Sequence, residues 1–567
     1  MASFLIAFLI SATTERTQAQ TALPGLRPPI EQLVPRQPPS VAPRLQVPAL
    51  PGAAEIPGAP ISIETARVEG ATAYPPAETA VWAQGLIGPA ISRTAIETAR
   101  LAIVDRYRYD GYVYTVVDAV ITRGNLRFQV TEGRIVAVKL DGDIGPAGVQ
   151  VLRFLNRLTE TQPIDIASLE RWLLLASDVP GVSLRSTLSP SADEPGALTL
   201  IANVERARVG GLLTADNRAF PQTGPEQLLA ILNFNSFTEY GERTQLSLYH
   251  ALDNSQIFGQ ASIEFYLGSS GLKLKLYSGS GNATPTGSLR LIGYDGTTTL
   301  FGGLLSYPLI RVRSQTLNLF GGFDGFESRI ATDLGAGGAS ATNSTDSLRI
   351  LRFGAEYALL DAVFFDRSAV NSVSGRASRG LDALGASPRG SALAARLNEK
   401  PNFTKVNGEI SRNQTLFTLW DDSSVALQGA VGGQYSRDIL PPAEKFYLGG
   451  AHFNRGYYWG QVTGDSALVA SVELQFNTPI PLPERVPIDL SAQFYGFYDW
   501  GQTWESVPRD PNVTLRSVGA GARFYVTKYT EFDFEGVTRL NRFPNGSGAN
   551  VSALKSNAFF WQVLARF

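Results

Sequence analysis

Residues 206–567 alternate apolar and polar side chains in short segments that are separated by clusters of Gly, Asn, Asp and Ser. In the segment TQLSLYH, Leu246 and Leu248 fall on one face of an extended strand, whereas Ser247 and Tyr249 fall on the other. A barrel in lipid requires such strands, because lipid offers the backbone no hydrogen-bond partner and the strands must close without a free edge. The pattern therefore predicts a transmembrane β-barrel.

Composition agrees with this prediction, and the length of the segment predicts the number of strands. The 567-residue chain contains 55 glycines and 10% aromatic residues, and no apolar run is long enough for a membrane-spanning helix. About 360 residues, at roughly 20 to 25 for a strand with its loop, predict on the order of 16 antiparallel strands. An interior of that size can hold water or a polypeptide. The composition alone would also fit a large soluble β protein.

Several classes of function are excluded. The net charge of −2 argues against a general nucleic-acid binder, and the absence of cysteine excludes disulfides, thiolate zinc sites and cysteine nucleophiles. His250 and His452 are far apart in sequence, so a two-histidine metal site is not expected. Residues 279–282 (GSGN) have no following helix and indicate a turn, and no Gly-x-Ser-x-Gly hydrolase motif occurs. We therefore expect no enzyme activity, no catalytic residues, no cofactor and no metal.

The last strand carries a second membrane signal. In NAFFWQVLARF, alternate residues form one largely apolar face that ends in a terminal aromatic: Phe559, Trp561, Val563, Ala565 and Phe567. This is the usual closing strand of bacterial outer-membrane barrels, and we interpret Phe567 as a terminal assembly signal.

The N-terminus is expected to direct export. Residues 1–20 contain a short apolar run and a weak small-residue cleavage site, as in a signal peptide. Residues 21–60 are rich in Pro, which disfavours helices and sheet ladders, so they predict an extended linker. A proline-motif ligand is the alternative for this segment.

Residues 61–205 predict two α+β domains with the same order of elements, strand, helix, helix, strand, strand, over residues 61–133 and 134–205. The first opens with a strand over residues 61–70, and Ser92 is the expected N-cap of its long helix. The helices are expected at residues 77–86, 92–108, 149–158 and 168–177.

The segment LPPAEKFYLGGAHFNRGYYWGQVTGDSALVASVE, residues 440–473, closely resembles the signature of two-partner secretion transporters, the haemolysin-activator and filamentous-haemagglutinin transporter family. That family carries a Val-Arg-Gly-Tyr motif on a long loop. Here the motif is Asn454-Arg455-Gly456-Tyr457, with Asn in place of Val and the Arg-Gly-Tyr core intact.

Further motifs resemble the family in the same order along the chain: residues 130–135 (VTEGRI), 216–218 (DNR), 307–311 (YPLIR) and 378–381 (SRGL). The resemblance covers residues 61–567. It implies an outer-membrane barrel over residues 206–567 that is preceded by two periplasmic POTRA domains.

The family also has an inner-wall motif, which Phe497-Tyr498-Asp499 matches. The alternation in IDLSAQFYGFYDWG independently places Phe497 and Asp499 on the polar, inward face. Arg455 is then the natural partner of Asp499, because a guanidinium can hold a carboxylate with two hydrogen bonds. The resemblance implies the same pairing. We expect Gly456 to let the backbone turn sharply beside the arginine and Tyr457 to pack against the wall.

The resemblance implies that the barrel moves a specific secreted exoprotein with an N-terminal secretion domain from the periplasm to the cell surface, and that the POTRA domains receive it. The expected partners also include outer-membrane lipid and the barrel-assembly machinery, but no nucleic acid. A barrel-assembly insertase of the same superfamily is the alternative, although such proteins usually carry more POTRA domains. A passive porin would not need the two periplasmic domains, and a membrane-embedded hydrolase has no motif in this sequence.

Overall fold

The computed structural model describes residues 41–42, 56–142, 144–191, 194–333, 341–420, 422–483, 485, 488–507, 510–544 and 553–567. The expected signal peptide, residues 1–20, and nearly all of the expected linker, residues 21–60, lie outside this range. Of the helices in the described residues, none has both the length and the hydropathy of a membrane-spanning helix.

The first N-terminal domain is a three-stranded sheet, in the order β2-β5-β4, that is covered by helices. Its elements are β1 (Ile61–Ile63), β2 (Thr65–Glu69), α3 (Pro76–Val81), η1 (Gln84–Leu86), β3 (Gly88–Ile91), α4 (Arg93–Tyr109), β4 (Val116–Thr122) and β5 (Asn125–Thr131). The Ser92 side chain caps α4 by accepting a hydrogen bond from the Ala95 amide, as expected. The single strand predicted at residues 61–70 is wrong: it is divided into β1 and β2, and β1 pairs with β3 instead of joining the main sheet.

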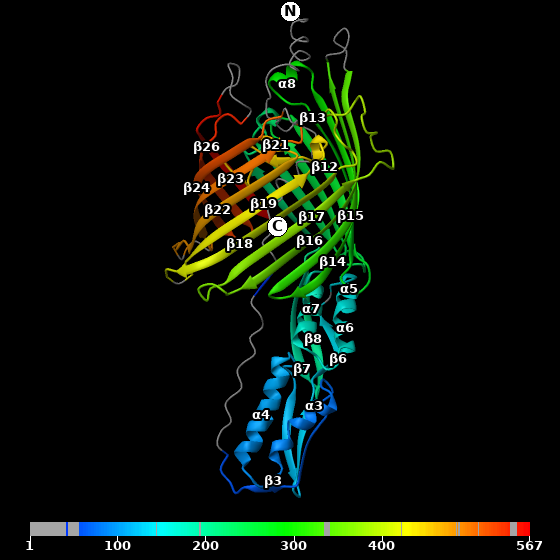
Figure 1. Cartoon of the computed structure of the whole chain (residues 1–567), viewed down its shortest axis with the longest axis vertical. Coiled ribbons are helices and arrows are strands. Elements are labelled where there is room, and N and C mark those ends of the chain that lie inside the picture. The colour runs from blue at the N-terminus through cyan, green and yellow to red at the C-terminus, as the bar shows by residue number, and fades with distance from the viewer. Residues whose placement is uncertain are drawn as a thin grey trace, which may run out of the picture.

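The second domain repeats this plan with the sheet order β6-β8-β7. Its elements are β6 (Arg134–Asp141), α5 (Ala147–Leu155), α6 (Arg157–Glu160), α7 (Ile166–Ser177), β7 (Val182–Pro190) and β8 (Ala197–Arg206). Its apolar core includes Phe154 and also Tyr266, which belongs to the barrel. The second domain therefore packs directly against one end of the barrel, and the first domain lies beyond it on the same side (Figure 1).

The rest of the chain forms a closed barrel of sixteen antiparallel strands, which confirms the predicted architecture. The strands are β9 (Val209–Asp216), β10 (Gln227–Asn235), β11 (Arg243–Ala251), β12 (Gln256–Tyr266), β13 (Lys273–Ala283), β14 (Asp295–Val312), β15 (Gln315–Thr332), β16 (Ala341–Asp361), β17 (Ala369–Gly380), β18 (Thr404–Thr418), β19 (Ser424–Ser436), β22 (Ser466–Pro479), β23 (Ser491–Trp504), β24 (Val513–Thr527), β25 (Thr530–Arg539) and β26 (Asn557–Arg566). The last strand pairs with the first, so the sheet has no free edge.

The two faces of the wall follow the predicted alternation. On β11, Leu248 is 49% exposed on the outside, whereas Tyr249 points inward and is buried. Phe559 on β26 and Phe567 directly after it are exposed. The inward face of β26 is less polar than expected, because Phe560 is buried in an apolar cluster there.

The terminal residue secures the seam between β9 and β26. The backbone of Phe567 exchanges hydrogen bonds with Gly211 at 2.9 and 3.2 Å. A Cβ on Gly211 would lie 2.2 Å from the Phe567 ring. Gly211 therefore leaves the space that the terminal ring occupies.

A salt bridge fixes the second domain to the barrel. Arg311, at the end of β14, holds the Asp178 carboxylate after α7 through two hydrogen bonds of 2.8 Å. Arg171 of α7 donates to the carbonyl oxygens of Pro308 and Leu309 at 3.0 and 3.2 Å. The YPLIR segment, which the sequence marked only as a motif, is thus a docking site for the second domain.

Candidate functional site

The connection between β19 and β22, residues 437–465, enters the barrel from the end opposite the two N-terminal domains and lies against its inner wall. It contains η4 (Pro442–Glu444) and a short hairpin of β20 (Phe446–Leu448) and β21 (Val462–Gly464). We call this connection the lumen loop. Its tip carries the Asn454–Tyr457 motif, and all four residues of the motif are buried.

Arg455 at the tip clasps Asp499 on β23. Its Nε donates to Asp499 Oδ2 at 3.0 Å, its Nη2 donates to Oδ1 at 3.0 Å, and its backbone amide donates to Oδ2 at 2.8 Å. The guanidinium carbon lies 3.5 Å from the centre of the Phe497 ring, which the same strand supplies. The structure thus brings together the residues that the sequence predicted as partners, with the two-pronged geometry that only arginine provides.

The guanidinium has further partners that sequence reasoning missed. On β22, Glu473 forms an ion pair with Arg455 Nη1, and Ser471 accepts a hydrogen bond from Nη2 at 3.1 Å. The Ser471 hydroxyl in turn donates to Asp499 at 2.7 Å. Burial alone would lower the pKa of the Arg455 guanidinium, but the Asp499 and Glu473 carboxylates outweigh burial and raise that pKa, so the arginine stays charged.

A wider network of charges surrounds this pair. It joins three arginines to four carboxylates from the loop and the wall: Arg218, Arg455, Arg523, Glu473, Asp499, Asp533 and Glu535. Arg523 holds Glu473 at 2.9 Å and Asp533 at 3.2 Å. Arg218, at the end of β9, binds Glu535 at 2.7 Å and donates to the Arg455 carbonyl oxygen at 2.8 Å. Each of these carboxylates therefore has an arginine partner, as buried charges require.

The role expected for Gly456 is wrong in part. The sharp turn falls on Asn454, whose φ of +57° lies in the left-handed region that Asn tolerates. Gly456 is needed for a close approach to the wall, because a Cβ there would lie 2.6 Å from the Ser517 Cβ and 2.9 Å from Val537. Its carbonyl oxygen accepts a hydrogen bond from Arg539, and its amide donates to Ser517 at 3.2 Å.

Tyr457 packs into the wall, as the sequence indicated. Its ring is fully buried, and its hydroxyl donates to the carbonyl oxygens of Arg516 at 2.8 Å and Asn541 at 2.7 Å. The loop tip is thus held by one charged side chain, by its backbone and by one aromatic anchor.

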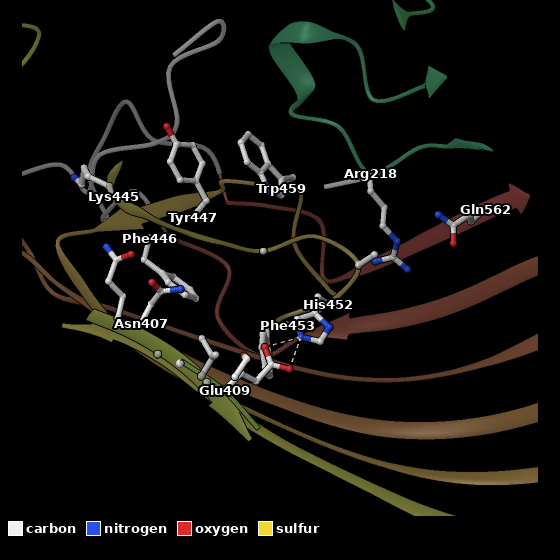
Figure 2. Close-up of a pocket in the computed structure, with 18 of the residues that line it drawn as sticks. Arg218, Asn407, Glu409, Lys445, Phe446, Tyr447, His452, Phe453, Trp459 and Gln562 are labelled. Carbon is white, nitrogen blue, oxygen red and sulfur yellow. Dashed lines mark hydrogen bonds and ion pairs between the residues drawn. The ribbon is translucent and has the colours of Figure 1, made fainter. Parts of the chain in front are cut away.

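A cavity of about 560 Å³ lies beside the loop and is lined by β17, β18 and β19 as well as by β24, β25 and β26. Figure 2 shows His452 of the loop directed across it at Glu409 of β18, and its Nε2 lies 3.2 Å from both carboxylate oxygens. Within the described part of the chain, no group of three or more His, Cys, Asp or Glu residues could hold a metal ion. The loop is thus tied to the wall by buried contacts and lies beside open space in the lumen.

Comparison with known proteins relates the two parts of the chain to one family. The profile of the haemolysin secretion/activation proteins ShlB/FhaC/HecB matches residues 199–524, and the profile of the ShlB-type POTRA domain matches residues 61–133. No curated protein matches the chain in sequence.

Two solved structures share its fold. CdiB from Escherichia coli superposes with a TM-score of 0.72 at 19% sequence identity, over 93% of this chain and 94% of that chain. CdiB from Acinetobacter baumannii gives a TM-score of 0.61 at 15% identity, over 99% of this chain and 97% of that chain.

Proposed function

Because the chain belongs to the ShlB/FhaC/HecB family of haemolysin secretion/activation proteins, we propose that it exports one partner exoprotein through its barrel and that the lumen loop gates the passage. The protein is an outer-membrane secretion transporter whose N-terminal domains lie in the periplasm. The identity of the cargo, its route and the movement of the loop form the proposal.

The observation that carries the gating proposal is the Arg455–Asp499 clasp inside a closed barrel. A loop that is tied to the wall by buried charges fills part of the lumen at rest. Water enters once the tie breaks, and the separated charges are then solvated, so the open state is accessible. A gate needs this combination of a firm closed state and a reachable open state.

Capture of the exoprotein would take place in the periplasm. Among the described residues, each of the two small sheets has two outer strands with a partner on one side, β2 and β4 in the first and β6 and β7 in the second. An extended N-terminal secretion domain can add to such an edge through backbone hydrogen bonds. The second domain is fixed beside the barrel mouth by Arg311 and Asp178, so a captured chain would be held close to the lumen.

Transport needs no catalytic group in this scheme. We propose that the protein is not an enzyme and uses no cofactor, and that folding of the exoprotein at the cell surface biases the direction. Insertion of the transporter itself into the outer membrane would depend on the barrel-assembly machinery, and Phe567 would be part of the signal that this machinery recognises.

The test is to compare culture supernatants and outer membranes of cells with and without this protein. We expect the loss of one large secreted protein and an unchanged set of outer-membrane barrels. A broad loss of barrels would instead indicate an insertase. Unchanged secretion together with reduced uptake of small solutes would indicate a porin, and either result would overturn the proposal.

A further inference from the structure

The lumen loop is tied to the barrel at a second point, far along the wall from Asp499. Glu444, at the end of η4, is buried between Arg352 of β16 and Lys405 of β18. Its carboxylate accepts hydrogen bonds from Arg352 at 2.8 and 3.2 Å and lies 2.8 Å from Lys405 Nζ. Its carbonyl oxygen also accepts from Lys405 at 2.7 Å and from Gln434 at 3.1 Å.

Several cations of the wall gather around Glu444. Arg352 also binds Asp324 of β15, and Arg376 of β17 lines the same cavity as Arg352 and Lys405. Without Glu444, the wall would keep these cations with one carboxylate fewer. Burial alone would raise the pKa of the Glu444 carboxyl, but Arg352 and Lys405 lower it, so Glu444 is charged.

The second tie borders a row of cavities in the lumen. These cavities have volumes of about 790, 300 and 560 Å³, and neighbouring cavities share wall residues. The first, beside the second periplasmic domain, shares Phe320 and Glu356 with the cavity at Glu444. That cavity shares Arg376 and Lys405 with the one in Figure 2. The free space therefore passes the part of the wall to which Glu444 is bound, and Arg455 is bound further round the barrel, at β22 and β23.

Two glycines set the turn of the chain between the two ties. Gly449 and Gly450 lie between Glu444 and Arg455, and both have a φ of +105°. Such backbone is easily reached only by glycine. Breaking the Arg455 tie would free the tip but leave the limb that carries Glu444 across the cavities.

We propose that Glu444 is a second latch, a positioning residue that holds the lumen loop across the route of the exported chain until Arg352 and Lys405 release it. This inference rests on the proposed gating by the loop. It adds that opening requires release of Glu444 from β16 and β18 as well as release of Arg455 from β22 and β23. Since the two sites share no partner, their effects on opening should be independent.

The test uses the purified full-length protein in planar lipid bilayers, without any substrate. Glu444→Gln keeps the shape of the side chain and removes its charge, and we expect at least a tenfold rise in the ratio of open to closed dwell times. Glu444→Asp should fall between Gln and the unaltered protein. Glu444→Gln combined with Arg455→Ala should raise the ratio by about the product of the two single effects.

Asp361→Asn is the matched control, because Asp361 pairs with Arg412 at 2.8 Å and both belong to wall strands. It should leave gating unchanged. Folding of each variant is checked by its shift in mobility on heating before electrophoresis. If Glu444→Gln does not fold, Lys405→Met removes a wall partner without altering the loop and must produce the same opening.

The outcomes separate this inference from the proposed function. Normal gating in folded Glu444→Gln, with increased opening in Arg455→Ala, would overturn the second latch and leave the gate in place. Normal gating in both variants would overturn gating by the loop. Secretion is measured in cells and does not enter either result.

Discussion

Replacing Arg455 with Ala should open the channel, and the size of the effect follows from its contacts. The substitution removes the two hydrogen bonds to Asp499, the ion pair with Glu473 and the contact with the Phe497 ring. It also leaves the Asp499 carboxylate, which is wholly buried, without its cation. Removing one partner of a buried ion pair costs about 3–5 kcal/mol.

We take the lower end of this range, because water in the lumen can solvate the carboxylates once the loop moves. About 3 kcal/mol corresponds to roughly a hundredfold change in an equilibrium, since about 1.4 kcal/mol is tenfold. The ratio of open to closed dwell times in planar bilayers should therefore rise about a hundredfold. Arg455→Lys keeps the charge but loses the two-pronged grip, so its effect should be intermediate.

The matched control is Arg412→Ala. Arg412 holds Asp361 with hydrogen bonds of 2.8 and 2.9 Å, but both residues lie on the wall and neither touches the loop. Its dwell times should match those of the unaltered protein. A folded Arg455→Ala protein with unaltered dwell times, or an equal effect from Arg412→Ala, would refute the reasoning.

Three further predictions concern other parts of the molecule. Phe567→Ala removes the ring that packs on Gly211 between β9 and β26, so less heat-modifiable barrel should reach the outer membrane. An unchanged amount of barrel would contradict the role of Phe567 in assembly. Arg311→Ala removes the salt bridge to Asp178, so the peptide bonds between β8 and β9 should become more sensitive to added protease. Equal cleavage rates in the variant and the unaltered protein would show that this salt bridge does not fix the second domain. Burial, together with the neighbouring Asp346, raises the pKa of Glu399 to about 9 in the connection between β17 and β18. Because that pKa lies above the unfolded value, the stabilisation is complete below about pH 4.5 and is lost as the pH rises towards 9. Proteolysis of this connection should therefore increase over that range, and Glu399→Gln should abolish the dependence; a pH-independent rate in the unaltered protein would contradict it.

The architecture could be predicted because alternation is a local property. Leu248 and Tyr249 belong to opposite faces of their strand whatever its neighbours are. The number of strands follows from length, and the helix start at Ser92 follows from its capping side chain. The break between β1 and β2 could not be predicted, because it depends on the pairing of β1 with β3.

The site was only partly predictable, for a physical reason. The alternation in β23 directs Asp499 inward, and Arg455 needs a carboxylate, so this pair could be proposed. Glu473 and Glu444 also lie within the segment that the sequence singled out, but nothing local shows which wall residue each one meets. Register around a closed barrel sets those partners, and register is a property of all the strands together.

A disulfide between the loop tip and the wall tests the central claim most directly. The chain has no cysteine, so Gly456→Cys with Ser517→Cys introduces a single pair. A Cβ on Gly456 would lie 2.6 Å from the Ser517 Cβ, and a slight retreat of the loop gives the roughly 3.5–4.5 Å that a disulfide needs. Export by the oxidised protein should stop and should return on reduction, while the protein with Ser517→Cys alone exports under both conditions. Equal export by the oxidised and reduced forms of the double variant would contradict the claim that the loop must leave the wall.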